Sequence, residues 1–311
     1  MELYIQNEQS LLEDPRGIAE DVIDRTAFKL LRDGPASLLV IYLHGASGTL
    51  GSSWRPPSYR AMSAGALDRR HTVAIDYRGF GSSTGVPSED GLLIDALTLA
   101  DWAMKMAGIA PSRIVLFRQS IGTAVAVSLA HHLASRPEPA LFSGMVLVAP
   151  FADVELLAAT YRLAGTVPLL SPVARIPRLL TFLNTLICSK WPAKEKIAEL
   201  VRRCEDLPGN GPNCHISLIH AEDDYDIPWL LCDQVLWHAA NASFPGGIMY
   251  EELEKEKRKV RVERGAGGWV VERRTEKSVV REEIVKYGLY DRIMSYPVVS
   301  LAILRAFGSG M

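Results

Sequence analysis

Short apolar runs separated by amphipathic segments dominate the chain. Runs typical of strands buried on both faces lie at residues 38–43, 72–76, 113–117, 144–150 and 215–221. Apolar residues recur at helical spacing within 88–104. Helices are also expected at 121–134, which is rich in small residues, and at 229–239, which follows Pro228. Strands that alternate with helices are typical of a mostly parallel, doubly wound sheet, so the pattern predicts an α/β fold.

Local signals add detail to this pattern. Ser88 is a suitable N-cap, and Glu89 and Asp90 suit the positive end of a helix dipole, so a helix is expected to begin here. The alternating charges of residues 251–264 predict a solvated helix face. Residues 268–288 predict two paired strands with a turn near Glu276.

Residues 153–213 interrupt the alternation. This segment has six prolines among apolar stretches such as RLLTFLNTLI, and prolines at this frequency delimit short helices. We therefore expect a core formed by residues 1–152 and 214–311, with 153–213 inserted as a helical cap over the carboxyl ends of the strands. Ligands of open α/β sheets bind at those ends, so an apolar cap predicts an apolar small-molecule substrate. The alternative is that these helices only cover the core.

Composition excludes several classes of protein. The chain has 311 residues and a formal net charge of −2, whereas a general nucleic-acid binder needs a basic surplus. The longest unbroken apolar run has six residues, and a membrane-spanning helix needs about twenty. The polar start MELYIQNEQS lacks the features of a signal peptide. We expect a cytoplasmic enzyme with no membrane segment and no nucleic-acid partner; the oligomeric state is not inferred.

The cysteines and histidines do not indicate a metal or a cofactor. Cys188, Cys204, Cys214 and Cys232 have no C-x-x-C spacing and no paired histidines at ligand spacing. A chain of this length does not depend on disulfides, so we expect reduced and mostly buried thiols. No glycine-rich phosphate-binding loop is present, so we expect no cofactor and no metal.

Candidate catalytic residues follow the ends of three expected strands. The run 38–43 ends in His44, Gly45 and Ala46, where small residues allow backbone N–H groups to face a pocket. The run 113–117 leads directly into a helix through the segment Arg118, Gln119, Ser120, Ile121 and Gly122. A serine on a tight strand-to-helix turn projects from the sheet, with the next N–H directed at its reaction partner. The run 215–221 is followed by Asp224, a carboxylate placed to orient a base.

These motifs resemble the α/β-hydrolase superfamily over residues 30–307. HGASGT is similar to the family's oxyanion motif, and DYRGFGSSTGVPSEDGLLIDA (76–96) resembles fungal members of the lipase group called α/β-hydrolase domain-containing protein 12. HAEDDYDIP (220–228) is similar to the family's acid turn, which places its aspartate at Asp224, and residues 286–307 resemble its closing loop and helix. The resemblance implies an eight-stranded sheet, a nucleophile at Ser120, and an oxyanion hole from the N–H groups of Ile121 and of Ala46 or its neighbour. It implies action on carboxylic esters of lipids or other apolar acyl compounds. Related lipases can carry an N-terminal membrane anchor.

Two positions depart from the family pattern. The elbow is G-x-S-x-G in the family, but its first glycine is Arg118 here. The closing loop carries the general base histidine in the family, but Tyr290 stands at this position. A free tyrosine has a pKa of about 10 against about 6.5 for histidine, a handicap of roughly 4 kcal/mol for a base at neutral pH. Among the other histidines, only His238 follows Asp224, and it is expected on a helix.

Arg118 and Tyr290 leave three functions open. We hypothesise that Arg118 reaches Asp224 and replaces the missing imidazolium electrostatically. One interpretation is an enzyme repurposed for condensation, cyclisation, dehydration or isomerisation of an apolar carbonyl compound of lipid or polyketide type. The alternatives are a serine esterase with another base and a catalytically dead ligand-binding protein. In the last case Ser120 only occupies a turn, Asp224 only braces the following helix, and Tyr290 only fills the pocket.

Overall fold

The computed structural model contains every strand expected above. It describes residues 2–6, 22–45, 48–63, 69–152, 157, 162–163, 167–168, 191–208, 214–244, 246–265 and 267–308.

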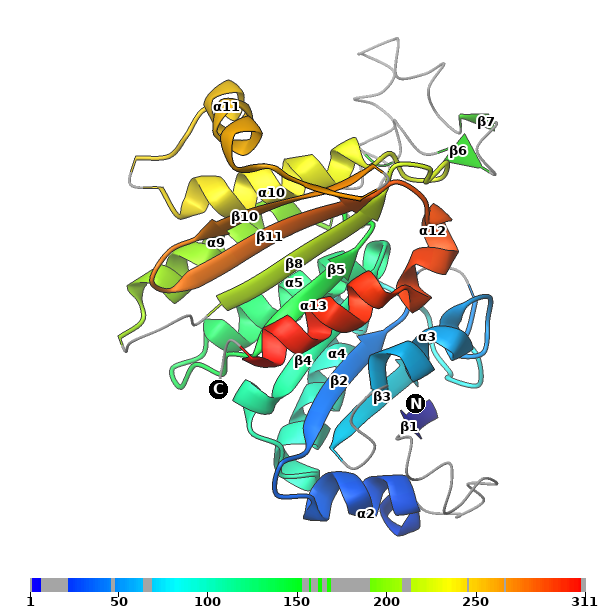
Figure 1. Ribbon diagram of the computed structural model, residues 1–311. Coiled ribbons are helices and arrows are strands. Elements are labelled where there is room, and N and C mark those ends of the chain that lie inside the picture. The colour runs from blue at the N-terminus through cyan, green and yellow to red at the C-terminus, as the bar shows by residue number, and fades with distance from the viewer. Residues whose placement is uncertain are drawn as a thin grey trace.

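A single large sheet forms the centre of the molecule (Figure 1). Its spatial order is β1 (Glu2–Gln6), β3 (Arg70–Asp76), β2 (Leu38–Leu43), β4 (Ile114–Gln119), β5 (Gly144–Val148), β8 (Cys214–Ala221), β11 (Ser278–Val285), β10 (Gly268–Arg274) and β9 (Val262–Arg264). The strands from β3 to β11 are parallel, and β1, β10 and β9 pair antiparallel at the two edges. The mostly parallel α/β class is confirmed, and among the described residues this sheet has nine strands where eight were expected.

Helices cover both faces of the sheet, because the parallel strands are apolar on both sides. One core cluster joins the sheet to α2 (Thr26–Asp33), α4 (Glu89–Asp101), α5 (Ile121–Ala134), α9 (Ala193–Asp206) and α10 (Leu230–Ala242). The other joins it to α3 (Arg55–Ser63) and α13 (Pro297–Gly308), which lies in front of the sheet in Figure 1. The expected cap of α4 is present, since Ser88 Oγ accepts a hydrogen bond from the Gly91 N–H at 3.1 Å.

Near the C-terminus the structure confirms the strand pair and corrects the charged helix. β10 and β11 pair antiparallel across the turn at Glu276. The charged run forms α11 (Tyr250–Val260) and then β9, and most of its side chains are exposed. Lys257 is an exception to the expected solvated face, because it is buried and ion-paired with Asp233 and with Glu282 at 3.0 Å.

The expected cap is described only in part. Residues 169–190, with the stretch RLLTFLNTLI, lie outside the described residues, so a helical cap there stays a prediction. Two short strands, β6 (Arg162–Leu163) and β7 (Val167–Pro168), pair antiparallel. The last part of the segment forms α9, whose apolar residues join the core cluster with α5 and α10. Helix α9 thus packs on the core beside α5 and α10.

Candidate active site

Ser120 lies on a sharp turn between β4 and α5. Its φ of 54° and ψ of −132° place it in a region that residues other than glycine rarely adopt. The turn is held by hydrogen bonds from the Ser120 N–H to the Val148 carbonyl at 3.0 Å and from the Thr123 N–H to the Ser120 carbonyl at 2.7 Å. Gly122 is needed for close packing, because a Cβ there would lie 2.9 Å from the Leu43 carbonyl oxygen. This is the geometry of a nucleophile elbow.

Arg118 does not reach Asp224, so the hypothesis of an electrostatic substitute for imidazolium is wrong. Its guanidinium donates a hydrogen bond to the Tyr77 hydroxyl at 2.6 Å. Tyr77 follows β3, two strands from β4 on one side, and Asp224 follows β8, two strands away on the other side. The alternation of side chains along β4 and the neighbouring apolar strands directs Arg118 into the core beneath the elbow.

Arg118 is a fully buried cation with few partners. Among the described residues, its Nε and one terminal nitrogen have no hydrogen-bond partner. Burial lowers the pKa of Arg118 to about 10, so the guanidinium still carries its charge at neutral pH. The side chain packs beneath the turn, where its Cδ would lie 3.6 Å from a Cβ on Gly122, and its guanidinium reaches Tyr77.

The loop after β2 is anchored by buried His44. Its Nδ1 lies 2.7 Å from the Gly45 carbonyl oxygen, and its Nε2 lies 3.3 Å from an oxygen of Asp76. Burial lowers the pKa of His44 to about 4, so the ring is neutral at physiological pH. A Cβ on Gly45 would lie 3.5 Å from the Tyr290 hydroxyl and 3.6 Å from Ser120 Cβ, which places Gly45 beside both groups. Ala46, the expected oxyanion residue, lies outside the described residues.

Asp224 is buried, and its carboxylate is engaged by its own loop. One oxygen accepts hydrogen bonds from the N–H groups of Asp226 and Ile227, each at 2.9 Å. The other lies 3.2 Å from Nε2 of His220, which is also 3.0 Å from the Ile227 carbonyl oxygen. The partner of Asp224 is therefore a buried histidine on β8, and this contact braces the turn.

Tyr290 meets Ser120 at the carboxyl edge of the sheet. The Tyr290 hydroxyl and Ser120 both lie beside Gly45, where a Cβ would be 3.5 Å from the hydroxyl oxygen and 3.6 Å from Ser120 Cβ, and Tyr290 packs against an apolar cluster of Ala149, Phe151 and Ile227. Burial raises the pKa of Tyr290 well above its ordinary value, the nearby Ser120 hydroxyl opposes this shift, and the negative charges of Asp291 and Asp224 add to it. The phenol is therefore neutral at physiological pH, a form that donates a hydrogen bond and does not accept a proton.

The structure thus brings together most of the residues expected at the site. Ser120, Tyr290 and Gly45 are in contact, Asp224 is near enough to act on the Tyr290 pKa, and Gln119 Nε2 donates to the Tyr290 carbonyl oxygen at 2.7 Å. Arg118 is separate from this group. Tyr77, the partner of Arg118, was missed as a site residue, although the D-Y-R-G segment that contains it was already used as a family motif.

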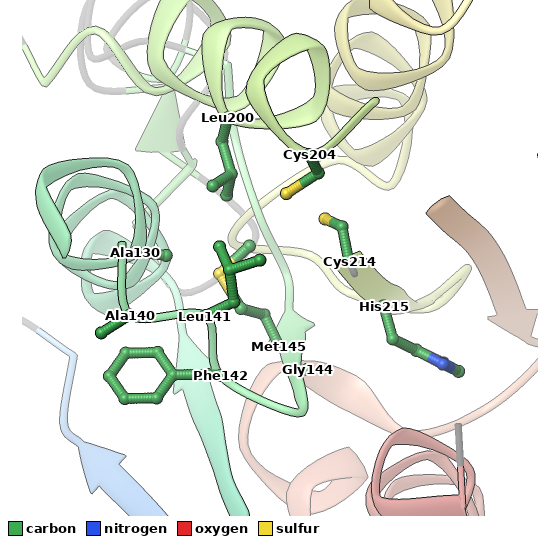
Figure 2. Close-up of a pocket in the computed structure, with 10 residues that line it drawn as sticks. All are labelled: Ala130, Ala140, Leu141, Phe142, Gly144, Met145, Leu200, Cys204, Cys214 and His215. Carbon is green, nitrogen blue, oxygen red and sulfur yellow. The ribbon is translucent and has the colours of Figure 1, made fainter. Parts of the chain in front are cut away.

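A small cavity lies near the amino-terminal ends of β5 and β8, at the opposite end of these strands from Ser120. Figure 2 shows the sulfur atoms of Cys204 and Cys214 pointing toward one another beside His215, and the cavity measures about 20 Å³. Cys214 is the first residue of β8, whereas Asp224 follows the last, so this cavity is distant from Ser120. Cys204, Cys214 and Cys232 are buried free thiols, as expected, and Cys188 lies outside the described residues.

Within the described residues, no three His, Cys, Asp or Glu side chains are grouped so that they could hold a metal ion. No helix in the part of the chain that the structure describes has the length and apolarity to cross a bilayer. The expected cytoplasmic location stays a prediction.

Comparison with known proteins identifies the class that this fold and elbow define. The α/β-hydrolase family matches residues 40–272, most of the chain, and the chain belongs to this enzyme family. The chain is 30% identical over 193 residues to lysophosphatidylserine lipase ABHD12 of Danio rerio, a match that covers 62% of this chain and 45% of that protein. It is 32% identical over 201 residues to protein ABHD12B of Homo sapiens, with 64% and 48% covered. The expected resemblance is confirmed, and the matches span less than half the length of these relatives.

Solved structures support the fold alone. An α/β-hydrolase from Vibrio vulnificus is similar with a TM-score of 0.51 and 18% identity, covering 88% of this chain and 74% of that chain. Est1E from Butyrivibrio proteoclasticus with bound ferulic acid has a TM-score of 0.52 and 12% identity, covering 98% and 92%.

Proposed function

We propose that this protein is an α/β-hydrolase-fold enzyme that polarises the carbonyl group of an apolar small molecule, of lipid or polyketide type, without forming an acyl-enzyme. The reaction class is condensation, cyclisation, dehydration or isomerisation. The observation that carries this proposal is the neutral phenol of Tyr290 against Ser120, at the position where a hydrolase has its imidazole base.

The phenol suits an electrophilic role. A hydrogen-bond donor directed at a carbonyl oxygen stabilises the negative charge that develops there, and removing one such donor typically costs about 10²–10³ in rate. A phenol with a raised pKa keeps its proton at neutral and moderately alkaline pH, so it is always ready to donate. For the same reason it cannot activate Ser120 as a general base.

The start of α5 supplies a second donor. The first N–H groups of a helix have no intrahelical acceptor, and the helix dipole is positive at this end. Ile121 is the first residue of α5 and directly follows Ser120, so its N–H is available to a carbonyl oxygen beside the elbow. Tyr290 and Ile121 both pack against the apolar cluster that contains Phe151 and Leu231, which favours an apolar substrate.

A serine esterase or lipase is the second candidate. The elbow at Ser120 retains hydrolase geometry, and one of the relatives is named lysophosphatidylserine lipase. This function requires a base, and His220, the histidine in contact with Asp224, is fully buried in the turn. The non-hydrolytic proposal needs no such base.

Carbonyl polarisation is testable with 2-undecanone labelled with ¹³C at its carbonyl carbon. On binding to the wild type, we expect the carbonyl resonance to move downfield, because donated hydrogen bonds draw electron density from the carbonyl carbon. Tyr290→Phe should abolish most of this shift, and Ser120→Ala should retain most of it. Nitrophenyl butyrate and nitrophenyl decanoate should not be hydrolysed by the wild type.

Other outcomes contradict the proposal. An upfield resonance typical of a tetrahedral carbon, lost in Ser120→Ala, would show that Ser120 adds to carbonyl groups as in a hydrolase. Ester turnover that disappears in Ser120→Ala would lead to the same conclusion. Binding of the ketone with no shift would identify a ligand-binding protein without this chemistry.

A further inference from the structure

Asp223, which precedes the expected acid, binds the backbone of the closing loop. One oxygen of its carboxylate accepts hydrogen bonds from the N–H groups of Gly288 and Leu289, both at 2.8 Å. Hydrogen bonds to an ionised carboxylate are roughly twice as strong as those between neutral groups. Tyr290 is the next residue, so this carboxylate holds the backbone immediately before the phenol.

The backbone at this point needs such support. Leu289 has a φ of 51°, in the left-handed region that costs a residue other than glycine about 1–3 kcal/mol. Gly288 lies close to its neighbours, since a Cβ there would be 3.1 Å from the Cβ of Ile293 and 3.2 Å from that of Ala221. Two successive N–H groups that point at one oxygen fix this conformation, and such strain persists only where surrounding contacts determine it.

A second contact fixes the other side of the residue. Gln119, the neighbour of Ser120, donates from Nε2 to the carbonyl oxygen of Tyr290 at 2.7 Å. We propose that Asp223 is a positioning residue which, together with Gln119, holds the Tyr290 phenol against Ser120. This inference rests on the function proposed above, because it assigns Asp223 a part in placing the reacting phenol.

Asp223 and Asp224 have separate tasks in this arrangement. Both oxygens of Asp224 are occupied within its own turn by Asp226, Ile227 and His220. Asp223 instead reaches across to the closing loop and acts through the backbone, without a contact to the phenol among the interactions of the described residues. Of the two adjacent carboxylates, Asp224 therefore braces its own turn and Asp223 holds the backbone that precedes Tyr290.

The position of the phenol is measurable independently of activity. Protein labelled with 3-fluorotyrosine gives a ¹⁹F spectrum in which the Tyr290 signal is identified by its loss in Tyr290→Phe. We expect Asp223→Ala to shift and broaden this signal, and Asp223→Asn to restore most of it, because the amide oxygen accepts the same two hydrogen bonds. Glu222→Gln is the matched control: this adjacent carboxylate pairs with Lys286 and should leave the signal unchanged.

The same variants separate this inference from the proposed function. The downfield shift of labelled 2-undecanone should fall at least threefold in Asp223→Ala and recover in Asp223→Asn. If the fluorine signal moves in Asp223→Ala but the wild type does not shift the ketone resonance, the positioning role of Asp223 is supported and the proposed function is contradicted. If the wild type shifts the ketone resonance but the fluorine signal is unmoved in Asp223→Ala, the proposed function is supported and the positioning role of Asp223 is contradicted. If Asp223→Ala does not fold, Asp223→Glu displaces the accepting oxygen by one methylene, and an unmoved fluorine signal in that variant overturns the proposal.

Discussion

The elbow around Ser120 and the closing loop around Tyr290 each carry one expected departure from the family pattern, with opposite consequences. At the elbow, Arg118 replaces glycine, yet its side chain extends into the core toward Tyr77 and the turn keeps its shape. In the closing loop, Tyr290 stands at the position expected for the histidine, and its hydroxyl lies beside Gly45 and Ser120 as a neutral phenol. The elbow thus accommodates the larger Arg118 side chain in the core, whereas no contact among the described residues gives Tyr290 a pKa low enough for it to act as a base.

Tyr290→His is the strongest test of this contrast. If the elbow is intact and only the base is missing, this variant should gain hydrolysis of nitrophenyl butyrate by at least about 10²-fold. The activity should rise with pH through the imidazole pKa, about 6.5 for an unperturbed histidine, because the neutral ring is the base. The double variant Tyr290→His/Ser120→Ala is the control and should be inactive. Absence of any Ser120-dependent gain would show that Arg118 has altered the elbow after all.

Substitution of Arg118 separates its volume from its charge. Arg118→Gly restores the family residue but leaves a void in the core, so the free energy of unfolding should fall by about 2–5 kcal/mol. Arg118→Met fills similar space without a buried charge and should be neutral or stabilising by about 1–4 kcal/mol. Urea unfolding measures both variants. An Arg118→Gly variant as stable as the wild type would contradict the idea that the core is packed around this side chain.

Two buried histidines should make the free energy of unfolding depend on pH. Burial lowers to about 4 the pKa of His44, which follows the carboxyl end of β2, and of His215, which lies near the amino-terminal end of β8. Below about pH 6.5 the unfolded chain binds protons that the folded protein does not. The free energy of unfolding should therefore fall as pH drops from 6.5 to 4, by up to about 1.4 kcal/mol per pH unit for each histidine.

Urea unfolding at pH 7, 6 and 5 measures this slope. His215→Gln should reduce this slope by about half of the combined contribution of His44 and His215. An unchanged slope in His215→Gln would mean that this ring is protonated in the folded protein.

The smallest expected effect concerns backbone strain, which the two regions share. Ser120 and Leu289 have φ values of 54° and 51°. Alanine normally stabilises a chain relative to glycine, but at a left-handed position glycine should be the more stable by about 1 kcal/mol. Thermal unfolding of Leu289→Gly and Leu289→Ala measures this difference in the closing loop. The variants Ser120→Gly and Ser120→Ala measure it at the elbow. Alanine being the more stable at Leu289 would indicate that the closing loop relaxes and carries no strain.

Much of the site was predictable because it depends on residues adjacent in the chain. The elbow follows from a strand, a serine and a helix in direct succession, and the expected residues Gln119, Ser120 and Ile121 lie there. The contact between Ser120 and Tyr290 was expected only through the family resemblance, since 170 positions separate them. The direction of Arg118 was mispredicted, because a fully buried arginine paired with a tyrosine hydroxyl has no signature in sequence.

The sequence by itself determined the α/β class, the order of strands and helices along the chain, and the residue types available for chemistry. Short continuous apolar runs, helical spacing of apolar residues and local capping signals specify these features, and all are short-range. The tertiary structure alone decided that Arg118 lies under the elbow, that Lys257 is buried in a charged helix, and that Asp223 reaches the closing loop. Each is a contact between segments distant in sequence, where packing across the sheet determines which polar groups meet and how their pKa values shift.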